Sequence, residues 1–110
     1  MLDVGCGTGV VTRDLAQRVG HQGQVVGIDP SERLIEVAVR RMEEGSLKGR
    51  IEFRSADGAA LPFPDGSFDL VVASAVFGHV PNGMEVLTEM VRVARPAGTV
   101  VAFDHDIDTI

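Results

Sequence analysis

Three glycines at alternate positions follow a carboxylate at the start of this chain: MLDVGCGTG places Gly5, Gly7 and Gly9 directly after Asp3. Glycine turns after strands usually hold phosphates, because glycine permits positive φ and lets the backbone approach a ligand closely. A carboxylate about 5 Å from a phosphate repels it by roughly 3 kcal/mol per charge pair, whereas it attracts an ammonium or sulfonium equally. The segment therefore predicts a cationic, nucleotide-like ligand.

The glycine spacing differs from the dinucleotide-binding fingerprint, in which a third glycine stands three residues after the second. Val10 occupies that position here. A glycine pattern alone is a weak signal, so two alternatives stay open at this point. One is an NAD-binding domain, which shares the sheet and an acid for the ribose, and the other is a cofactor-binding module without catalysis.

A second acid stands at the end of a short β-branched run, QVVGI at residues 24–28, which is followed by Asp29 and Pro30. A carboxylate offers two acceptors to a diol, and Asp29 lies at the distance after the glycine loop expected for a ribose partner. Asp29 is therefore a candidate for binding a nucleoside ribose. The bland alternative is an acid that begins the turn before the next helix.

Three other features of the sequence are weaker indications of a functional site. The stretch FDHDID near the end of the chain contains Asp104, His105, Asp106 and Asp108. Such ligands bind Mg or Mn, but at a strand end they more often form a solvated rim, so we expect no metal. Cys6 is explained by a small buried residue between glycines. His21 stands in a polar turn, where an exposed side chain is expected.

The elements that would position these residues alternate between strands and helices. Apolar residues at helical spacing predict a helix over 10–19, with Val10, Val11, Leu15 and Val19 as its apolar positions, and a second helix to about Glu44, capped by Ser31 and buried through Leu34, Ile35, Ala38 and Met42. Strands are predicted at 24–28 and 51–54. The prolines and the Asp-Gly turn of 61–68 predict a loop.

The second half of the chain continues the alternation. A near-continuous apolar run predicts a strand at 69–73, and TVVAF predicts the last strand at 99–103. Between them a helix capped by Asn82 is expected to end before Pro96, with Val86, Leu87, Met90, Val91 and Ala94 as its buried face. The order predicts an α/β domain with a parallel sheet and helices on both faces, whose ligand lies beyond the carboxyl ends of the strands.

Length, charge and cysteine content limit the function classes. The 110 residues allow one domain with a genuine core, over 1–110. The formal charge of −6 argues against a broad nucleic-acid face but leaves a small-molecule site open. The single Cys6 excludes a disulfide within the chain and fits a reducing, cytoplasmic location. No segment has the apolar length needed to span a membrane, and residues 1–12 lack the pattern of a signal peptide.

Four segments in order, LDVGCGTG, VVGIDPS, SADGAALPFPDGSFDLVVAS and EMVRVARPAGTVVAFD, resemble the class I S-adenosylmethionine-dependent methyltransferases. The resemblance is greatest to methyltransferase domain type 11, which includes ubiquinone and menaquinone biosynthesis enzymes. It covers nearly the whole chain. It implies a three-layer Rossmann-like sandwich, here truncated to about five strands in the order 3-2-1-4-5, S-adenosylmethionine as cofactor, and methyl transfer to a small-molecule acceptor.

The resemblance also implies roles for particular residues. Asp3 would face the methionyl ammonium directly or through water, and Asp29 would accept from both ribose hydroxyls. The other implied cofactor-binding residues are Gly5, Cys6 and Gly7 by backbone approach, Pro30 against the adenine or ribose, Asp57 and Gly58 beside the adenine, and Ser74 near the methionyl part. His79 stands where the family often has a histidine near the acceptor. A base there is an alternative to a histidine that packs the loop, and the catalytic residues are left unassigned.

Two departures from the family pattern qualify these expectations. The resemblance leads us to expect a capping helix before residue 1 and further strands after the fifth, so the chain is expected to be a fragment of a longer protein. Neither the acceptor nor the oligomeric state is readable from these residues. Ala97 replaces the second residue of the usual Pro-Gly-Gly, a mild change only where that position does not need positive φ.

Overall fold

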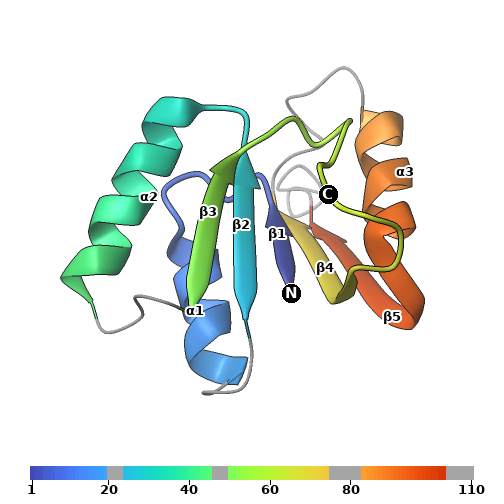
Figure 1. Cartoon of the computed structure of the whole chain (residues 1–110), viewed down its shortest axis with the longest axis horizontal. Coiled ribbons are helices and arrows are strands. Elements are labelled where there is room, and N and C mark those ends of the chain that lie inside the picture. Colours follow the sequence, from blue (N-terminus) through green and yellow to red (C-terminus); the bar gives the residue numbers. More distant parts are fainter. Residues whose placement is uncertain (20–23, 46–49, 75–82, 104–110) are drawn as a thin grey trace, which may run out of the picture.

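The computed structural model of the chain describes residues 1–19, 24–45, 50–74 and 83–103. Strands and helices alternate along these residues as the sequence predicts. A loop without a helix joins the third and fourth strands, which is also as predicted (Figure 1). The elements are β1 (Leu2–Val4), α1 (Val10–Val19), β2 (Val25–Asp29), α2 (Glu32–Glu44), β3 (Ile51–Ser55), β4 (Phe68–Ser74), α3 (Gly83–Val93) and β5 (Ala94–Phe103).

The five strands form one parallel sheet in the order β3-β2-β1-β4-β5. This confirms the predicted order 3-2-1-4-5 and the Rossmann-like α/β class. Strand order reverses next to β1, which lies between β2 and β4. The carboxyl ends of β1, β2 and β4 therefore meet at the edge of the sheet where such folds bind their ligands.

Successive residues of the strands point to opposite faces and fill two separate cores. On one face Val25 and Ile51 pack with Ala16 of α1. On the other face Val26 joins a larger cluster that includes Met90 of α3. Helices α1 and α2 thus cover one face, and α3 covers the β4 side of the other (Figure 1).

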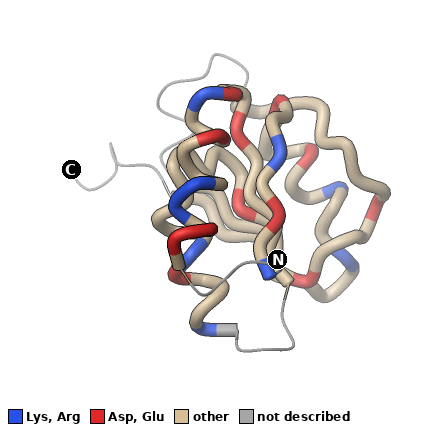
Figure 2. The backbone as a smooth tube through the Cα atoms, turned by 60° about the vertical axis from the view of Figure 1, so that its left-hand side comes forward, with Lys and Arg blue, Asp and Glu red and all other residues tan. Residues whose placement is uncertain are grey.

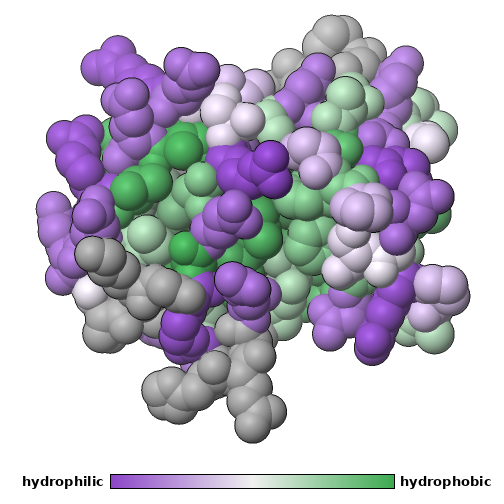
Figure 3. Space-filling view, viewed as in Figure 1, coloured by the Kyte–Doolittle hydropathy of each residue, from purple (hydrophilic) through white to green (hydrophobic). Residues whose placement is uncertain are grey.

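The crossover from β3 to β4 is a loop, as predicted, but it covers residues 56–67 where 61–68 were expected, and it runs over the same face of the sheet as α3 (Figure 1). Leu61 of this loop is buried in the larger core. Figure 3 shows hydrophobic residues gathered in the middle of this face, with hydrophilic residues along both sides. A loop therefore covers part of the apolar sheet face where crossovers more often place a helix.

The buried faces of the first two helices differ from those predicted. Val10 is 61% exposed and Val11 is 42% exposed, and Thr12 and Ala16 supply the buried face of α1 instead. Leu34, expected in the buried stripe of α2, is 37% exposed. Ser31 caps α2 as predicted, since its side chain accepts a hydrogen bond from the Leu34 amide.

The boundary between α3 and β5 also differs from the prediction. Val91 is 58% exposed, because the residues that reach the core lie at Val86, Met90 and Val93. Ala94 was expected on the helix but begins β5, where it pairs with Phe68. The helix ends before Pro96 as expected, and Pro96 lies within β5 between Ala94 and Thr99, where the register with β4 is interrupted, a position that tolerates proline.

Ala97 lies in the left-handed region of backbone space, with φ 67°. It is the only non-glycine residue with positive φ in the described part of the chain. Alanine in place of the family's glycine is a mild change only where φ is not positive, so at this position the change is not mild. A Cβ in this region costs roughly 1 kcal/mol relative to glycine.

We expect Ala97→Gly to raise the free energy of unfolding by about 1 kcal/mol, since it removes this strain. Chemical denaturation measures the change. Gly98→Ala is the matched control, because a Cβ there would lie 2.9 Å from the Arg95 carbonyl oxygen and 3.0 Å from that of Asp69, and this variant should be destabilised. A loss of stability in Ala97→Gly would contradict the strain at this position.

Figure 2 shows acidic and basic residues interspersed along the described backbone. Among the helices of the described residues, none has the length and apolar character to cross a membrane.

Candidate functional site

The glycine loop between β1 and α1 is a compact turn fastened to the end of β2. Gly5, Gly7 and Gly9 have φ values of 75°, 55° and 84°, which confirms the expectation that these glycines supply positive φ. The amides of Gly5 and Cys6 both donate to the Ile28 carbonyl oxygen, at 2.8 and 2.9 Å. The loop is therefore held where the β1 and β2 ends meet.

Asp29 ties this loop to the beginning of α2. Its Oδ2 accepts from the Gly7 amide at 3.0 Å, and its Oδ1 accepts from the Ser31 amide at 2.9 Å. The residue is 9% exposed. Each carboxylate oxygen can accept a second hydrogen bond, so Asp29 retains acceptors for a ligand beyond the two amides.

Asp3 lies beneath the loop, 1% exposed, on the same face of the sheet as Asp29. Its Oδ2 accepts from the Thr12 hydroxyl at 2.7 Å, whereas Oδ1 has no hydrogen-bond partner among the described residues. Burial raises the pKa of Asp3 to about 6, and the nearby charge of Asp29 adds to the rise, against the lowering effect of the Thr12 hydrogen bond. An ionised Asp3 is thus costly here until a cation comes near.

Asp3 has almost no exposed surface for direct contact with a ligand. Its carboxylate lies behind the backbone of the glycine loop, so its charge would attract a cationic ligand across that backbone. Cys6 is buried as expected. Burial, with the charges of Asp3 and Asp29, raises the pKa of its thiol to about 12, so it stays protonated and unreactive at neutral pH.

The space around the glycines differs from one position to the next. A Cβ on Gly9 would lie 2.8 Å from Cζ of Phe53, and one on Gly27 would lie 2.9 Å from the same ring. A Cβ on Gly7 would meet no atom of the described residues within 4 Å. Gly9 and Gly27 thus serve packing under Phe53, while Gly7 faces open space that a ligand can fill.

Asp57 and Gly58 lie in the loop after β3, next to the end of β2, because the Ala56 amide donates to the Asp29 carbonyl oxygen at 3.1 Å. The Asp57 side chain is exposed and its Oδ1 accepts from the Ala59 amide at 2.9 Å, which closes a turn and leaves Oδ2 outward. Gly58 is packed on the core, since a Cβ there would lie 3.3 Å from side chains of Val4 and Val86.

The remaining predicted residues are placed only in part. Pro30 is exposed directly after β2, and its carbonyl oxygen accepts from the Ser55 hydroxyl at 3.4 Å. Ser74 is the last residue of β4, paired with Phe103, at the same edge of the sheet. His21, His79 and the residues of the metal hypothesis at 104–108 lie outside the described residues. In the described part of the chain, no group of three or more His, Cys, Asp or Glu side chains could hold a metal.

Sequence reasoning did not identify Thr12 and Phe53 as residues that support the site. Thr12 is fully buried on α1 and holds Asp3, and its signal is a lone hydroxyl four residues before the buried Ala16. Phe53 has no such local signal, because its contact with Gly9 depends on β2 and β3 lying side by side.

The comparisons with known proteins agree with this architecture. A family model described as "Methyltransferase domain" matches residues 2–102. Demethylmenaquinone methyltransferase of Lactococcus lactis is 40% identical over 110 residues, which are 100% of this chain and 43% of the relative. Its namesake in Bacillus cereus is 42% identical over 109 residues, 99% of this chain and 46% of the relative. The chain thus spans under half the length of these relatives.

Solved structures show the same fold. A SAM-dependent methyltransferase from Aquifex aeolicus is 30% identical with a TM-score of 0.79, over 86% of this chain and 50% of that one. The [4+2]-cyclase SpnF is 32% identical with a TM-score of 0.84, over 91% of this chain and 36% of that one.

Proposed function

Because the chain belongs to the methyltransferase domain family, which matches residues 2–102, we propose that it binds S-adenosylmethionine and serves methyl transfer to a small-molecule acceptor. The observation that carries the proposal is the pair of buried acids, Asp3 and Asp29, beside a glycine loop with open space over Gly7. A cationic nucleoside fits this arrangement, since Asp3 has a buried oxygen that no described residue partners.

Each residue near the loop has a proposed binding role. Asp29 accepts from the ribose hydroxyls with its remaining acceptor positions, and the outward Oδ2 of Asp57 accepts from the adenine amine. The glycine backbone lies along the cofactor at Gly5, Cys6 and Gly7. Pro30 and Gly58 border the nucleoside, and Ser74 lies near the methionyl part.

The proposed mechanism depends mainly on positioning. S-adenosylmethionine supplies a methyl group on a positively charged sulfur, which is already an activated leaving group. The chain's own residues then have to hold the nucleoside and exclude alternative orientations, so that the acceptor meets the methyl group in line. His79 remains a prediction as the base for a phenol or enol acceptor.

The acceptor is proposed to be a small molecule. The demethylmenaquinone methyltransferases among the relatives make a demethylated quinol the first acceptor to test. The place of action is proposed to be the cytoplasm, which suits the free thiol of Cys6.

Calorimetric titration with S-adenosylhomocysteine and with NAD tests the proposal. We expect S-adenosylhomocysteine to bind and NAD not to bind. The NAD reading has one observation in its favour: Arg13 donates to the Thr8 carbonyl oxygen at 2.8 Å and Arg41 reaches the Thr8 hydroxyl at 3.5 Å, so positive charges flank the loop. Tight binding of NAD without the homocysteine compound would overturn our proposal.

A second candidate is cofactor binding without methyl transfer. The similarity to a [4+2]-cyclase favours it, since that protein is named for a different reaction. Incubation with radiolabelled S-adenosylmethionine and a demethylated quinol distinguishes the two. Bound cofactor without labelled product over a broad acceptor panel would favour the second candidate.

The glycine loop gives a prediction with a built-in control. We expect Gly7→Ala to weaken S-adenosylhomocysteine binding about tenfold, because its methyl group would enter the open space over the loop. Both glycines have positive φ, so either alanine should lower the free energy of unfolding by roughly 1 kcal/mol, and Gly9→Ala should lower it by about 2 kcal/mol more because its Cβ would collide with Phe53. Calorimetry and chemical denaturation measure the two effects. If Gly7→Ala and the unmodified chain bind S-adenosylhomocysteine with equal affinity, the ligand does not occupy the space over Gly7.

A further inference from the structure

One turn of α3 fastens the loop between β3 and β4. The Arg92 guanidinium donates to the carbonyl oxygens of Leu61 at 3.0 Å and Phe63 at 2.9 Å. It also donates to Oδ1 of Asp65 at 2.8 Å. A single side chain thus holds three positions of the loop, which are 27 to 31 residues away in sequence.

Glu89 completes the attachment from the preceding turn of the helix. Its Oε2 accepts from Nε of Arg92 at 2.6 Å, and its Oε1 accepts from the Leu61 amide at 2.8 Å. The hydrogen bonds that Arg92 donates hold the pKa of Glu89 below its usual range, and the acceptance of these bonds by Glu89 and Asp65 raises the pKa of Arg92. Both groups stay charged at neutral pH, and we call them the Glu89–Arg92 pair.

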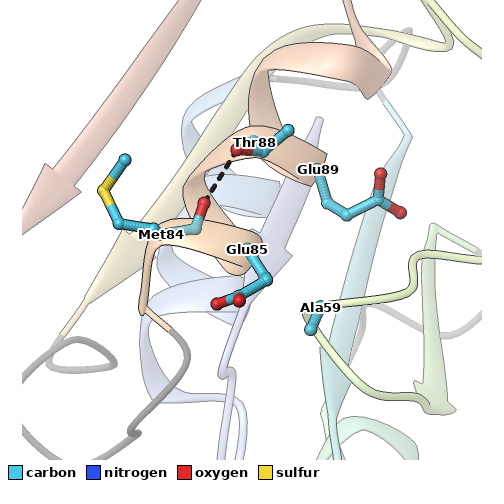
Figure 4. A pocket seen from close by; sticks show the side chains of 5 residues that line it. All are labelled: Ala59, Met84, Glu85, Thr88 and Glu89. Carbon is cyan, nitrogen blue, oxygen red and sulfur yellow. Dashed lines mark hydrogen bonds between the residues drawn. The ribbon is translucent and has the colours of Figure 1, made fainter.

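The pair acts where apolar packing is incomplete. A pocket of about 340 Å³ separates Ala59 of the loop from α3, lined by Ala59, Met84, Glu85, Thr88 and Glu89. In Figure 4, Ala59 of the loop lies across the pocket from Glu85 and Glu89 of α3. Polar contacts therefore hold the loop beside this gap, with buried Leu61 as the adjoining apolar anchor.

The segment fixed in this way includes the proposed adenine contact. Asp57 and Ala59 form one turn. On one side of it the Ala56 amide donates a hydrogen bond to the Asp29 carbonyl oxygen, and on the other side the Leu61 amide donates one to Glu89. The turn is thus attached both to Asp29, the proposed ribose contact, and to α3. The direction of the Asp57 carboxylate depends on both attachments.

On this basis we propose that Glu89 and Arg92 are positioning residues, which set the turn at Asp57 so that the site selects adenine by its amino group. The inference rests on the proposed function, because it assigns Asp57 to the adenine. Neither side chain has to touch the ligand. Their effect passes through the backbone of residues 57–61.

The test compares S-adenosylhomocysteine with S-inosylhomocysteine, in which a carbonyl oxygen replaces the adenine amino group. We expect the unmodified chain to prefer the adenine compound at least tenfold, since Asp57 accepts from the amine and repels the carbonyl. Arg92→Met should reduce this preference at least threefold. Arg92→Lys, which keeps the charge without the planar fork, should fall between the two. Arg18→Met is the matched control, because its exposed ion pair with Asp14 lies on α1.

Hydrogen exchange of the ligand-free proteins supplies an independent measurement. We expect the amides of residues 57–66 to exchange faster in Arg92→Met, and also in the milder Glu89→Gln, than in Arg18→Met. Equal exchange rates, or an unchanged preference for adenine in Arg92→Met, would overturn the inference. Failure of the unmodified chain to bind S-adenosylhomocysteine would instead overturn the proposed function, and exchange would still show whether the pair holds the loop.

Discussion

Asp29→Asn weakens binding of S-adenosylhomocysteine at least tenfold, or about 1.4 kcal/mol, in the result that we expect from titration calorimetry. The first reason is the proposed contact with the ribose. A carboxylate accepts from both hydroxyls with charge-assisted hydrogen bonds, while an amide has one acceptor oxygen and no charge.

The second reason is visible in the structure itself. The two oxygens of Asp29 accept from the amides of Gly7 and Ser31. An asparagine must direct its NH₂ group at one of these donors, so either the glycine loop or the first turn of α2 loses its attachment. The free energy of unfolding should fall by about 1 to 2 kcal/mol as well.

Binding of an analogue without ribose hydroxyls separates the two reasons. If Asp29 contacts the diol, removing the hydroxyls should cost much less affinity in Asp29→Asn than in the unmodified chain. Asp14→Asn is the control, because it makes the same charge change on the exposed face of α1. Equal affinity for S-adenosylhomocysteine in the Asp29 and Asp14 variants would remove Asp29 from the site.

The alternation of strands and helices and the acid at the end of β2 could be predicted from short-range patterns, whereas the strand order was implied by the resemblance to the methyltransferases. Helical spacing located α1 and α2, and the position of Asp29 after an apolar run placed it at the sheet edge. The exposure of Val10 and Val91 was not predictable in this way. Helical spacing identifies an apolar face, but the neighbouring elements determine how much of it is covered.

The interactions that support the site depend on long-range pairing. Phe53 reaches Gly9 because β3 lies beside β2, and Arg92 reaches Leu61 across 31 residues of sequence. The beginning of β5 at Ala94 similarly depends on its pairing with Phe68. No local pattern reports such contacts, and for the same reason the sequence did not indicate that Asp29 holds the glycine loop through the Gly7 amide.

Stability and ligand binding should respond to pH in opposite directions through Asp3. Its pKa is about 6 in the folded chain and 3.8, the ordinary value of an aspartate, in the unfolded chain, so between these two the folded carboxyl keeps a proton that the unfolded one has lost. Raising the pH through this range therefore favours unfolding. The shift corresponds to about 3 kcal/mol of unfolding free energy, fully present below pH 4 and lost above pH 6.

Asp3→Asn isolates this contribution, because asparagine can still accept from Thr12 but does not titrate. Urea denaturation from pH 4 to 7 measures the unfolding free energy of both proteins. As the pH rises, the unmodified chain should lose stability relative to Asp3→Asn. Contributions from groups that the substitution leaves unchanged cancel in this difference. Parallel profiles would show that Asp3 does not carry the raised pKa.

Binding should show the opposite slope. The α-ammonium of S-adenosylhomocysteine, which has no sulfonium charge, favours the ionised Asp3, so the affinity of the unmodified chain for this compound should weaken about tenfold from pH 7 to pH 5. In Asp3→Asn this dependence should disappear, together with part of the affinity at pH 7. The unpartnered oxygen of Asp3 would then destabilise the unliganded fold and strengthen the binding of a cation beside the glycine loop. A pH-independent affinity in the unmodified chain would contradict that role and leave Asp29 as the acid that matters.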